Sequence, residues 1–198
     1  MLVLAIVGGG YALLGGMSAP EDLGVRASEA DFDAAVAKAH VDWPELPPGA
    51  DPADFERVYI GVQPMDVMLT EAELSALMSY RHDPSYWPLS NVQVDLTGPD
   101  TARMSAVVTY AGRDWPVYVE GSGGFSGSAL FADISAARVG AISVPESFLP
   151  TGSDALEAMI NDRLARIPGL DVETLDVTAQ GVHAIGTIWQ TAEYVPVG

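Results

Sequence analysis

Few residues in this chain have the type and spacing that chemistry requires. The glycine-rich run 121–127 looks superficially like a phosphate loop, but it lacks the lysine of a P-loop and precedes a strand pattern instead of a helix. The three histidines, His40, His82 and His183, lie far apart in the sequence, whereas a zinc site needs three or four converging donors. We expect a hairpin loop at 121–127, surface or capping histidines, and no metal site.

Catalytic groups are equally sparse. Glu71 and Glu73 lie two positions apart on a predicted helix, where side chains diverge, so they do not form a general acid/base pair. The sequence contains no G-x-S-x-G elbow that would expose a nucleophilic serine. It also contains no cysteine, which excludes disulfides and thiolate chemistry. We therefore expect no catalytic residues and no cofactor, and a protein that is not an enzyme.

Charge and length narrow the possible partners. The 198 residues include 27 acidic and 9 basic side chains, which gives a formal net charge of -18. Such a chain repels a phosphate backbone, so nucleic acid is not an expected partner. A chain of this length suits one domain with a true core and short appendages, because it can bury roughly 70% of its unfolded surface.

The elements that would position any site begin with the stretch 91–145, which alternates between apolar and polar residues. Val92, Val94 and Leu96 fall on one face of a strand at 91–97, and short turns imply antiparallel neighbours. Pro116 indicates that its own strand starts there or lies at an edge. The predicted strands of this region are 91–97, 101–110, 115–120, 130–134 and 139–144, the last apolar on both faces.

Three helices and several flanking strands complete the pattern. Ser28 caps a helix to about His40, Thr70 and Glu73 form a capping box, and Ser153 caps a helix that ends near Pro168. Further strands are predicted at 58–62, 65–69, 170–178, with a bulge near 173–174, and 182–189.

The segment Leu2–Met17 is uncharged and of membrane type. As a helix it would span roughly 24 Å at about 1.5 Å per residue, which is short of the ~30 Å hydrocarbon core. It also lacks a basic flank, and a cleaved signal peptide is the alternative to a retained anchor. We favour the anchor, because a polar tether follows it. Gly8, Ala12 and Gly16 then form a small-residue stripe that would contact another membrane helix.

These patterns predict three regions. Residues 1–18 are a single-pass transmembrane anchor, residues 19–56 are a tether, a helix and a proline-rich connector, and residues 57–198 are an extracytoplasmic α+β domain. The expected location is the cell membrane, with the main domain outside the cytoplasm.

Several short motifs together resemble a known family. The capped helix start 69–74, the stretch 140–145, a helix around Ile160 and Asn161, and two closing strands behind a membrane segment look like the YpmS-type anchored extracytoplasmic proteins. More distantly, residues 57–190 are similar to tubular lipid-binding (TULIP-like) domains. The resemblance implies a strongly curved antiparallel sheet packed around one or two helices, with an apolar groove between them and no catalytic residues.

Two functions remain open from the sequence. The domain could bind a lipid or another apolar ligand, or it could be a structural, accessory subunit of a larger membrane protein complex with other transmembrane subunits. Ordinary core packing is the third account of the apolar residues concerned. The residues predicted to line a ligand groove are Val139, Ile142, Val144, Leu156, Met159, Ile160 and Leu164.

Overall fold

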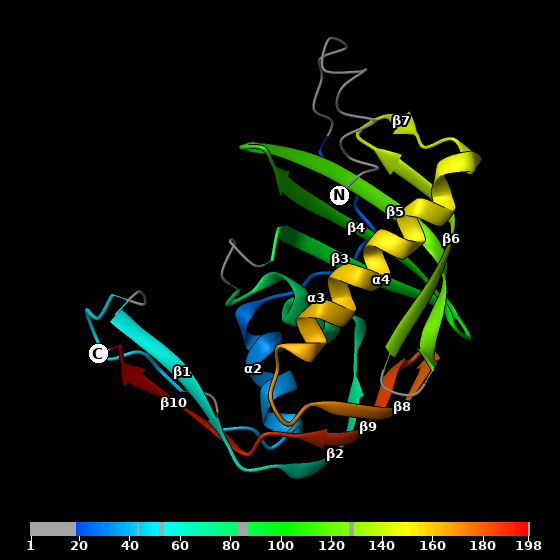
Figure 1. The fold of residues 1–198 in the computed structure, drawn as a ribbon. Coiled ribbons are helices and arrows are strands. Elements are labelled where there is room, and N and C mark those ends of the chain that lie inside the picture. Colours follow the sequence, from blue (N-terminus) through cyan, green and yellow to red (C-terminus); the bar gives the residue numbers. More distant parts are fainter. Residues whose placement is uncertain (1–18, 43, 52–53, 83–86, 127–128, 198) are drawn as a thin grey trace.

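The computed structural model describes residues 19–42, 44–51, 54–82, 87–126 and 129–197. It confirms the α+β class with mostly antiparallel sheet (Figure 1). The helices are α2 (Glu29–Lys38), α3 (Glu71–Ser79) and α4 (Leu149–Ala165), with the 3-10 turn η2 (Glu146–Phe148) before α4. The strands are β1 (Phe55–Ile60), β2 (Gln63–Leu69), β3 (Leu89–Gly98), β4 (Thr101–Tyr110), β5 (Arg113–Ser126), β6 (Ala129–Val139), β7 (Ile142–Ser143), β8 (Asp171–Thr178), β9 (Gly181–Ile188) and β10 (Thr191–Pro196).

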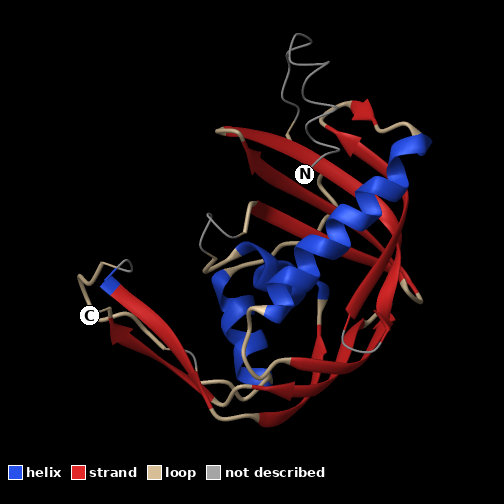
Figure 2. Cartoon of the chain, in the orientation of Figure 1, coloured by secondary structure: helices blue, strands red, loops and turns tan. Residues whose placement is uncertain are grey.

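The strands form three antiparallel groups. The largest has the order β3-β4-β5-β6-β7, a second has the order β2-β9-β8, and β1 pairs with β10. Figure 2 shows the groups following one another around a bend, with all three helices on its inner side. Val92, Val94 and Leu96 are buried on the inner face of β3, as the alternation predicted. The main hydrophobic core lies between this face, α3 and β9.

Both long edges of the five-stranded sheet are capped by a helix through side-chain contacts. Polar residues at every fourth position of the helix accept hydrogen bonds from every second backbone N–H of the edge strand. The two spacings match, because four helical residues rise about 6 Å and two strand residues about 6.6 Å. On β3 the pairs are Leu96 with Glu71 at 2.7 Å, and Val94 with Ser75 and Val92 with Ser79, both at 2.9 Å. On β6 they are Ile134 with Ser153 at 3.0 Å, Ala132 with Glu157 at 2.7 Å and Leu130 with Asn161 at 2.8 Å.

The start of α4 differs from the prediction. The helix begins at Leu149, with Pro150 in its first turn, and Ser153 is an interior residue. Proline is favoured there because its fixed φ suits a first turn whose N–H groups have no helical partners. The Ser153 hydroxyl, instead of capping α4, accepts the N–H of Ile134 and lies 3.3 Å from the carbonyl of Leu149.

The glycine-rich run 121–127 is also different, because β5 continues as a strand to Ser126. A register shift between Glu120 and Gly121 marks a bulge in the pairing with β6. At Gly121 a Cβ atom would collide with the carbonyl oxygen of Asp133. Glycine therefore serves a close approach of two strands here, and the loop predicted at this position was wrong.

Two further strand predictions need correction. The segment 139–144 is not one strand, because Gly140 takes a φ of 58° and turns the chain into the short β7. Strand β10, which pairs with β1, was not predicted. Pro116 lies near the start of β5, which is an interior strand, so its alternative placement at a sheet edge is wrong. The carbonyl of Pro116 accepts the N–H of Gly140, just beyond the end of the β5–β6 pairing.

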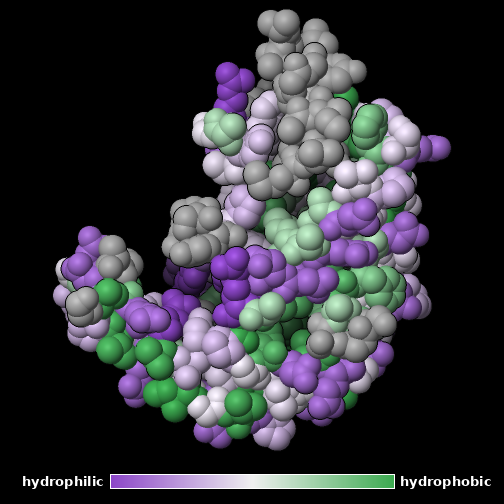
Figure 3. All heavy atoms as spheres, viewed as in Figure 1, coloured by the Kyte–Doolittle hydropathy of each residue, from purple (hydrophilic) through white to green (hydrophobic). Residues whose placement is uncertain are grey.

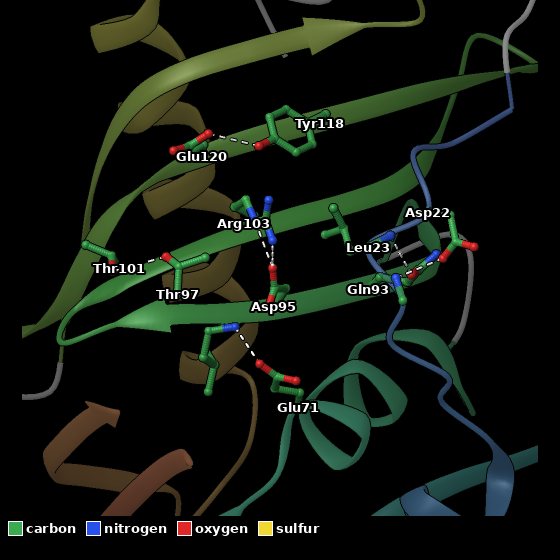
Figure 4. A network of polar contacts seen from close by, with 12 residues as sticks. Asp22, Leu23, Glu71, Gln93, Asp95, Thr97, Thr101, Arg103, Tyr118 and Glu120 are labelled. Carbon is green, nitrogen blue, oxygen red and sulfur yellow. Dashed lines mark hydrogen bonds and ion pairs between the residues drawn. The ribbon is translucent and has the colours of Figure 1, made fainter. Parts of the chain in front are cut away.

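The region before β1 is largely part of the same folded unit. Helix α2 has the predicted cap at Ser28, and it contacts α3 through the Lys38–Glu73 ion pair. Before it, the N–H of Leu23 donates to Gln93 on the outer face of β3, beside the Arg103–Asp95 ion pair (Figure 4).

The predicted anchor 1–18, with Gly8, Ala12 and Gly16, lies outside the described residues. Among the residues that the structure does describe, none of the helices combines the length and the apolar character needed to cross a membrane.

Candidate ligand cavity

A cavity of about 1690 Å³ lies on the inner side of the bend, between the sheets and the helices. The alternation of strands β3, β4 and β6 directs apolar side chains into it, among them Leu96, Met104 and Leu130. Strands β8 and β9 contribute Val172, Leu175, Val177, Val182 and Ala184 from the facing sheet. Figure 3 shows the polar outer side of α4, with apolar residues in the hollow next to it. The walls are mostly apolar and combine residues from all three helices and from most of the strands.

Helix α4 provides the part of this wall that the sequence indicated. Leu156, Ile160 and Leu164 line the cavity at four-residue spacing. Met159, one position from Ile160, packs on the main core instead.

The other three predicted groove residues lie elsewhere. Val139, Ile142 and Val144 belong to or follow the β6–β7 hairpin and are not among the lining residues. The turn at Gly140 carries this stretch to one end of the sheet, away from the cavity wall. The stretch 139–144, which is apolar on both faces of a predicted strand, therefore belongs to a hairpin.

Polar and aromatic side chains form one end of the cavity. Arg57 and Tyr59 come from β1, Tyr194 from β10, His82 and Trp87 from the segment after α3, and Arg163 from the last turns of α4. The Nη2 of Arg57 donates to the hydroxyl of Tyr194 at 2.6 Å. The Nε1–H of Trp87 donates to the carbonyl of Met78 at 2.8 Å, which fixes the ring.

His82 holds Arg163 in a defined position. The Nη2 of Arg163 lies 2.8 Å from Nδ1 of His82, and Nε2 of His82 lies 2.5 Å from the carbonyl of Leu77. Because guanidinium only donates, Nδ1 must accept and Nε2 must carry the proton, which defines a neutral imidazole. Burial lowers the pKa of His82, and the charges of Arg163 and Arg57 lower it further, against the hydrogen bond to Leu77. All of this favours the neutral form.

Burial and neighbouring charges also act on the pKa values of Arg163 and Arg57. Burial lowers the pKa of Arg163, as do the nearby charges of Arg57 and Arg166. Burial also works to lower the pKa of Arg57, but hydrogen bonds to Tyr194 and Tyr59 outweigh it, and the net pKa is raised. Both guanidinium groups remain charged at neutral pH.

Sequence reasoning missed this polar end. His82 has one of its two predicted roles, because its Nε2 donates to the carbonyl of Leu77 in the last turn of α3, but its position half-buried against the cavity was not predicted. His183 pairs with exposed Asp66 at the surface. Arg57, His82 and Arg163 are widely separated in the sequence, so no local spacing connects them. The available indication was chemical, since Arg57 and Arg163 are two of only 9 basic residues in the chain.

Within the described ranges, no group of three or more His, Asp or Glu side chains is arranged to hold a metal ion. Comparison with known proteins gives no relative, since no family model, curated protein or solved structure matches the chain.

Proposed function

We propose that this protein is a non-enzymatic, membrane-anchored domain that binds a lipid or another large apolar ligand in the cavity between its sheets and α4. The observation that carries the proposal is the volume of about 1690 Å³ together with its mostly apolar walls. Sites for small molecules usually enclose roughly 300–1,000 Å³. The larger volume suits a ligand with one or more long hydrocarbon chains.

The energetics of cavities support a ligand over an unfilled space. Water in this space gains few hydrogen bonds from walls built of Leu, Val, Met and Ile. Hydrocarbon is the occupant whose transfer from water is favourable.

The location forms part of the same proposal. An anchor at residues 1–18 would keep the domain at the outer face of the cell membrane, where amphipathic ligands are at hand. The resemblance to YpmS-type and TULIP-like proteins supports it, and so does the position of α4 across the inner side of the bent sheet (Figure 1).

A larger side chain introduced on the cavity wall would fill part of the volume, and this substitution tests the proposal. Ala132 lies on β6 and lines the cavity, whereas Ala136 on the same strand is exposed and does not. We expect Ala132→Trp to occupy part of the volume and to weaken binding of Nile red, a neutral apolar dye, by at least about tenfold. Ala136→Trp adds the same ring on the outside and should leave dye binding unchanged, with fluorescence titration as the measurement.

The proposal fails if wild-type protein does not take up the dye, or if the two tryptophan variants bind it as wild type does. Thermal unfolding of both variants identifies any loss of binding caused by unfolding alone.

One observation favours the alternative of a structural subunit. The β1–β10 pair exposes large apolar side chains, with Val58 39%, Ile60 42% and Val195 43% exposed. Glu56 and Glu193 lie among them, which disfavours contact with an anionic membrane surface and suits a protein partner. If Val58→Asp removes stoichiometric chains that otherwise copurify from the native membrane while dye binding persists, the domain has this second role.

A further inference from the structure

Helix α4 is attached to the rest of the fold in two different ways along its length. Its first part is fixed to the edge of β6, because Ser153, Glu157 and Asn161 accept backbone N–H groups of that strand. Beyond Asn161, Arg163 and Leu164 line the cavity, and Arg163 contacts the segment that follows α3. The position of the C-terminal end of α4 therefore depends on a contact between side chains.

His82 is the centre of that contact. The Nη2 of Arg163 donates to Nδ1 of His82 at 2.8 Å, and Nε2 of His82 donates to the carbonyl of Leu77, in the last turn of α3, at 2.5 Å. The centre of the Trp87 ring lies 5.5 Å from that of His82 and 5.7 Å from the Arg163 guanidinium. One neutral imidazole thus joins α4 to α3 beside an aromatic ring.

Protonation of His82 is incompatible with this geometry. An imidazolium carries a hydrogen on both ring nitrogens, so Nδ1 can no longer accept from Arg163, and two cations would face each other. Their repulsion is stronger at this half-buried place than in water. The contact with Leu77 survives, because Nε2 still donates. The added proton therefore acts on the α4 side of His82 and separates Arg163 from it.

The charged groups around His82 favour the neutral form. Burial and the charges of Arg163 from α4 and Arg57 from β1 lower its pKa, against the hydrogen bond to Leu77. Six carboxylates line the same cavity, yet the charges that shift the pKa of His82 are those of the two arginines. The six are Asp33, Glu45, Glu56, Asp100, Glu120 and Asp133. Of these, Asp33 pairs at 2.8 Å with Arg81, the residue before His82.

We propose that His82 is a pH-sensitive switch at the end of the cavity: the neutral imidazole holds the C-terminal end of α4 in place, and protonation releases that end and lets a bound ligand leave. Release of the helix end follows from the contacts above, whereas release of a ligand rests on the proposed function. The pKa of His82 in the folded protein lies below the ordinary 6.5, so the contact persists above pH 6.5 and is lost as the pH falls through the folded-state pKa.

NMR titration of the His82 ring in the full chain tests the protonation step. At neutral pH we expect an uncharged ring with its proton on Nε2. Arg163→Gln keeps a donor for Nδ1 and removes the positive charge, so it should raise the pKa of His82. His183→Gln is the matched control, since it removes a histidine that pairs with exposed Asp66 at the surface, and it should leave the pKa of His82 unchanged.

Hydrogen exchange of the amides of α4, measured by mass spectrometry, tests the release of the helix end. After correction for the intrinsic pH dependence of exchange, protection of residues 162–167 should fall by at least about tenfold as His82 is protonated, because a hydrogen bond to a charged group is lost. Residues 153–161, which are fixed to β6, should stay protected. Bound Nile red should be released over the same pH range.

The variant His82→Gln retains one donor and one acceptor but has no group that takes up a proton in this range. We expect its exchange at 162–167 and its retention of Nile red to be independent of pH where those of wild type change. Melting temperatures at neutral pH show whether the variant folds as wild type does. If it does not, the rise in the pKa of His82 in Arg163→Gln decides.

Equal pH dependence of exchange in wild type and His82→Gln would overturn the proposal. So would a neutral ring with its proton on Nδ1, or a ring that does not titrate before the protein unfolds. Dye that stays bound after the helix end is released would overturn the release of ligand and leave the proposed function standing. Dye that does not bind at any pH would contradict the proposed function itself, and exchange alone would then judge the switch.

Discussion

At the residue scale, single polar side chains complete the backbone hydrogen bonding of the sheet edges. Ser75 is fully buried in α3, and its hydroxyl accepts the N–H of Val94 at 2.9 Å. An edge strand with free N–H groups invites pairing with another chain, and here helices satisfy those groups. The six residues concerned could have been found in the sequence as polar positions four apart within two apolar helices. That spacing was missed because polar helix residues usually face solvent.

Removing one such hydroxyl should destabilise the fold. Ser75→Ala leaves the buried N–H of Val94 without its acceptor, which costs about 1–3 kcal/mol. Ser147→Ala in the exposed η2 turn is the control and should change stability very little. Urea unfolding of both variants provides the measurement. Equal stability of Ser75→Ala and wild type would show that the contact with Val94 contributes nothing.

At the element scale, two of the three described helix starts and most strands could be predicted from local patterns. The predicted cap at Ser28 and the predicted capping box at Thr70 are both present, and β8 has its predicted bulge between Val172 and Thr174. Local patterns failed where tertiary contacts decide the structure. The sequence alone predicts a loop at Gly121, but glycine is needed there because β6 approaches closely. It likewise predicts a helix cap at Ser153, whose hydroxyl instead accepts the N–H of Ile134.

The contact between α2 and α3 should make stability depend on pH. Glu73 is buried, which raises its pKa, but Lys38 at 2.7 Å and the Thr70 cap outweigh burial and lower the pKa below its ordinary 4.5. A carboxylate with a lowered folded-state pKa stabilises the fold above about pH 4.5, and this contribution is lost as the pH falls through the folded-state value.

The isosteric variant Glu73→Gln keeps a cap acceptor and removes the charge. We expect it to be less stable than wild type by about 1 kcal/mol or less at pH 7, because Lys38 is partly exposed. The difference should shrink toward zero as the pH falls through the folded-state pKa of Glu73, which lies below 4.5. Denaturant unfolding across this range is the measurement, and a difference that stays constant with pH would contradict the assignment to charge.

At the scale of the whole molecule, the cavity is a product of topology. The amphipathic helix at 153–168 indicated one of its walls, and Leu156, Ile160 and Leu164 do line it. The remaining walls include residues of β2 to β6, β8 and β9. The alternation of apolar and polar residues in each strand predicts only that one face is buried. Whether that face meets core or a ligand depends on how far the sheet bends, and alternation carries no information about bending.

The central claim is that the cavity binds an amphiphile, and native mass spectrometry of the full chain extracted from its own membrane tests it most directly. We expect a peak at the mass of the chain plus one lipid-sized ligand, with organic extraction recovering a lipid or another apolar molecule. Ala132→Trp should reduce the occupied fraction, and Ala136→Trp should not. Protein that appears only as the bare chain, in wild type and both variants alike, would contradict the account.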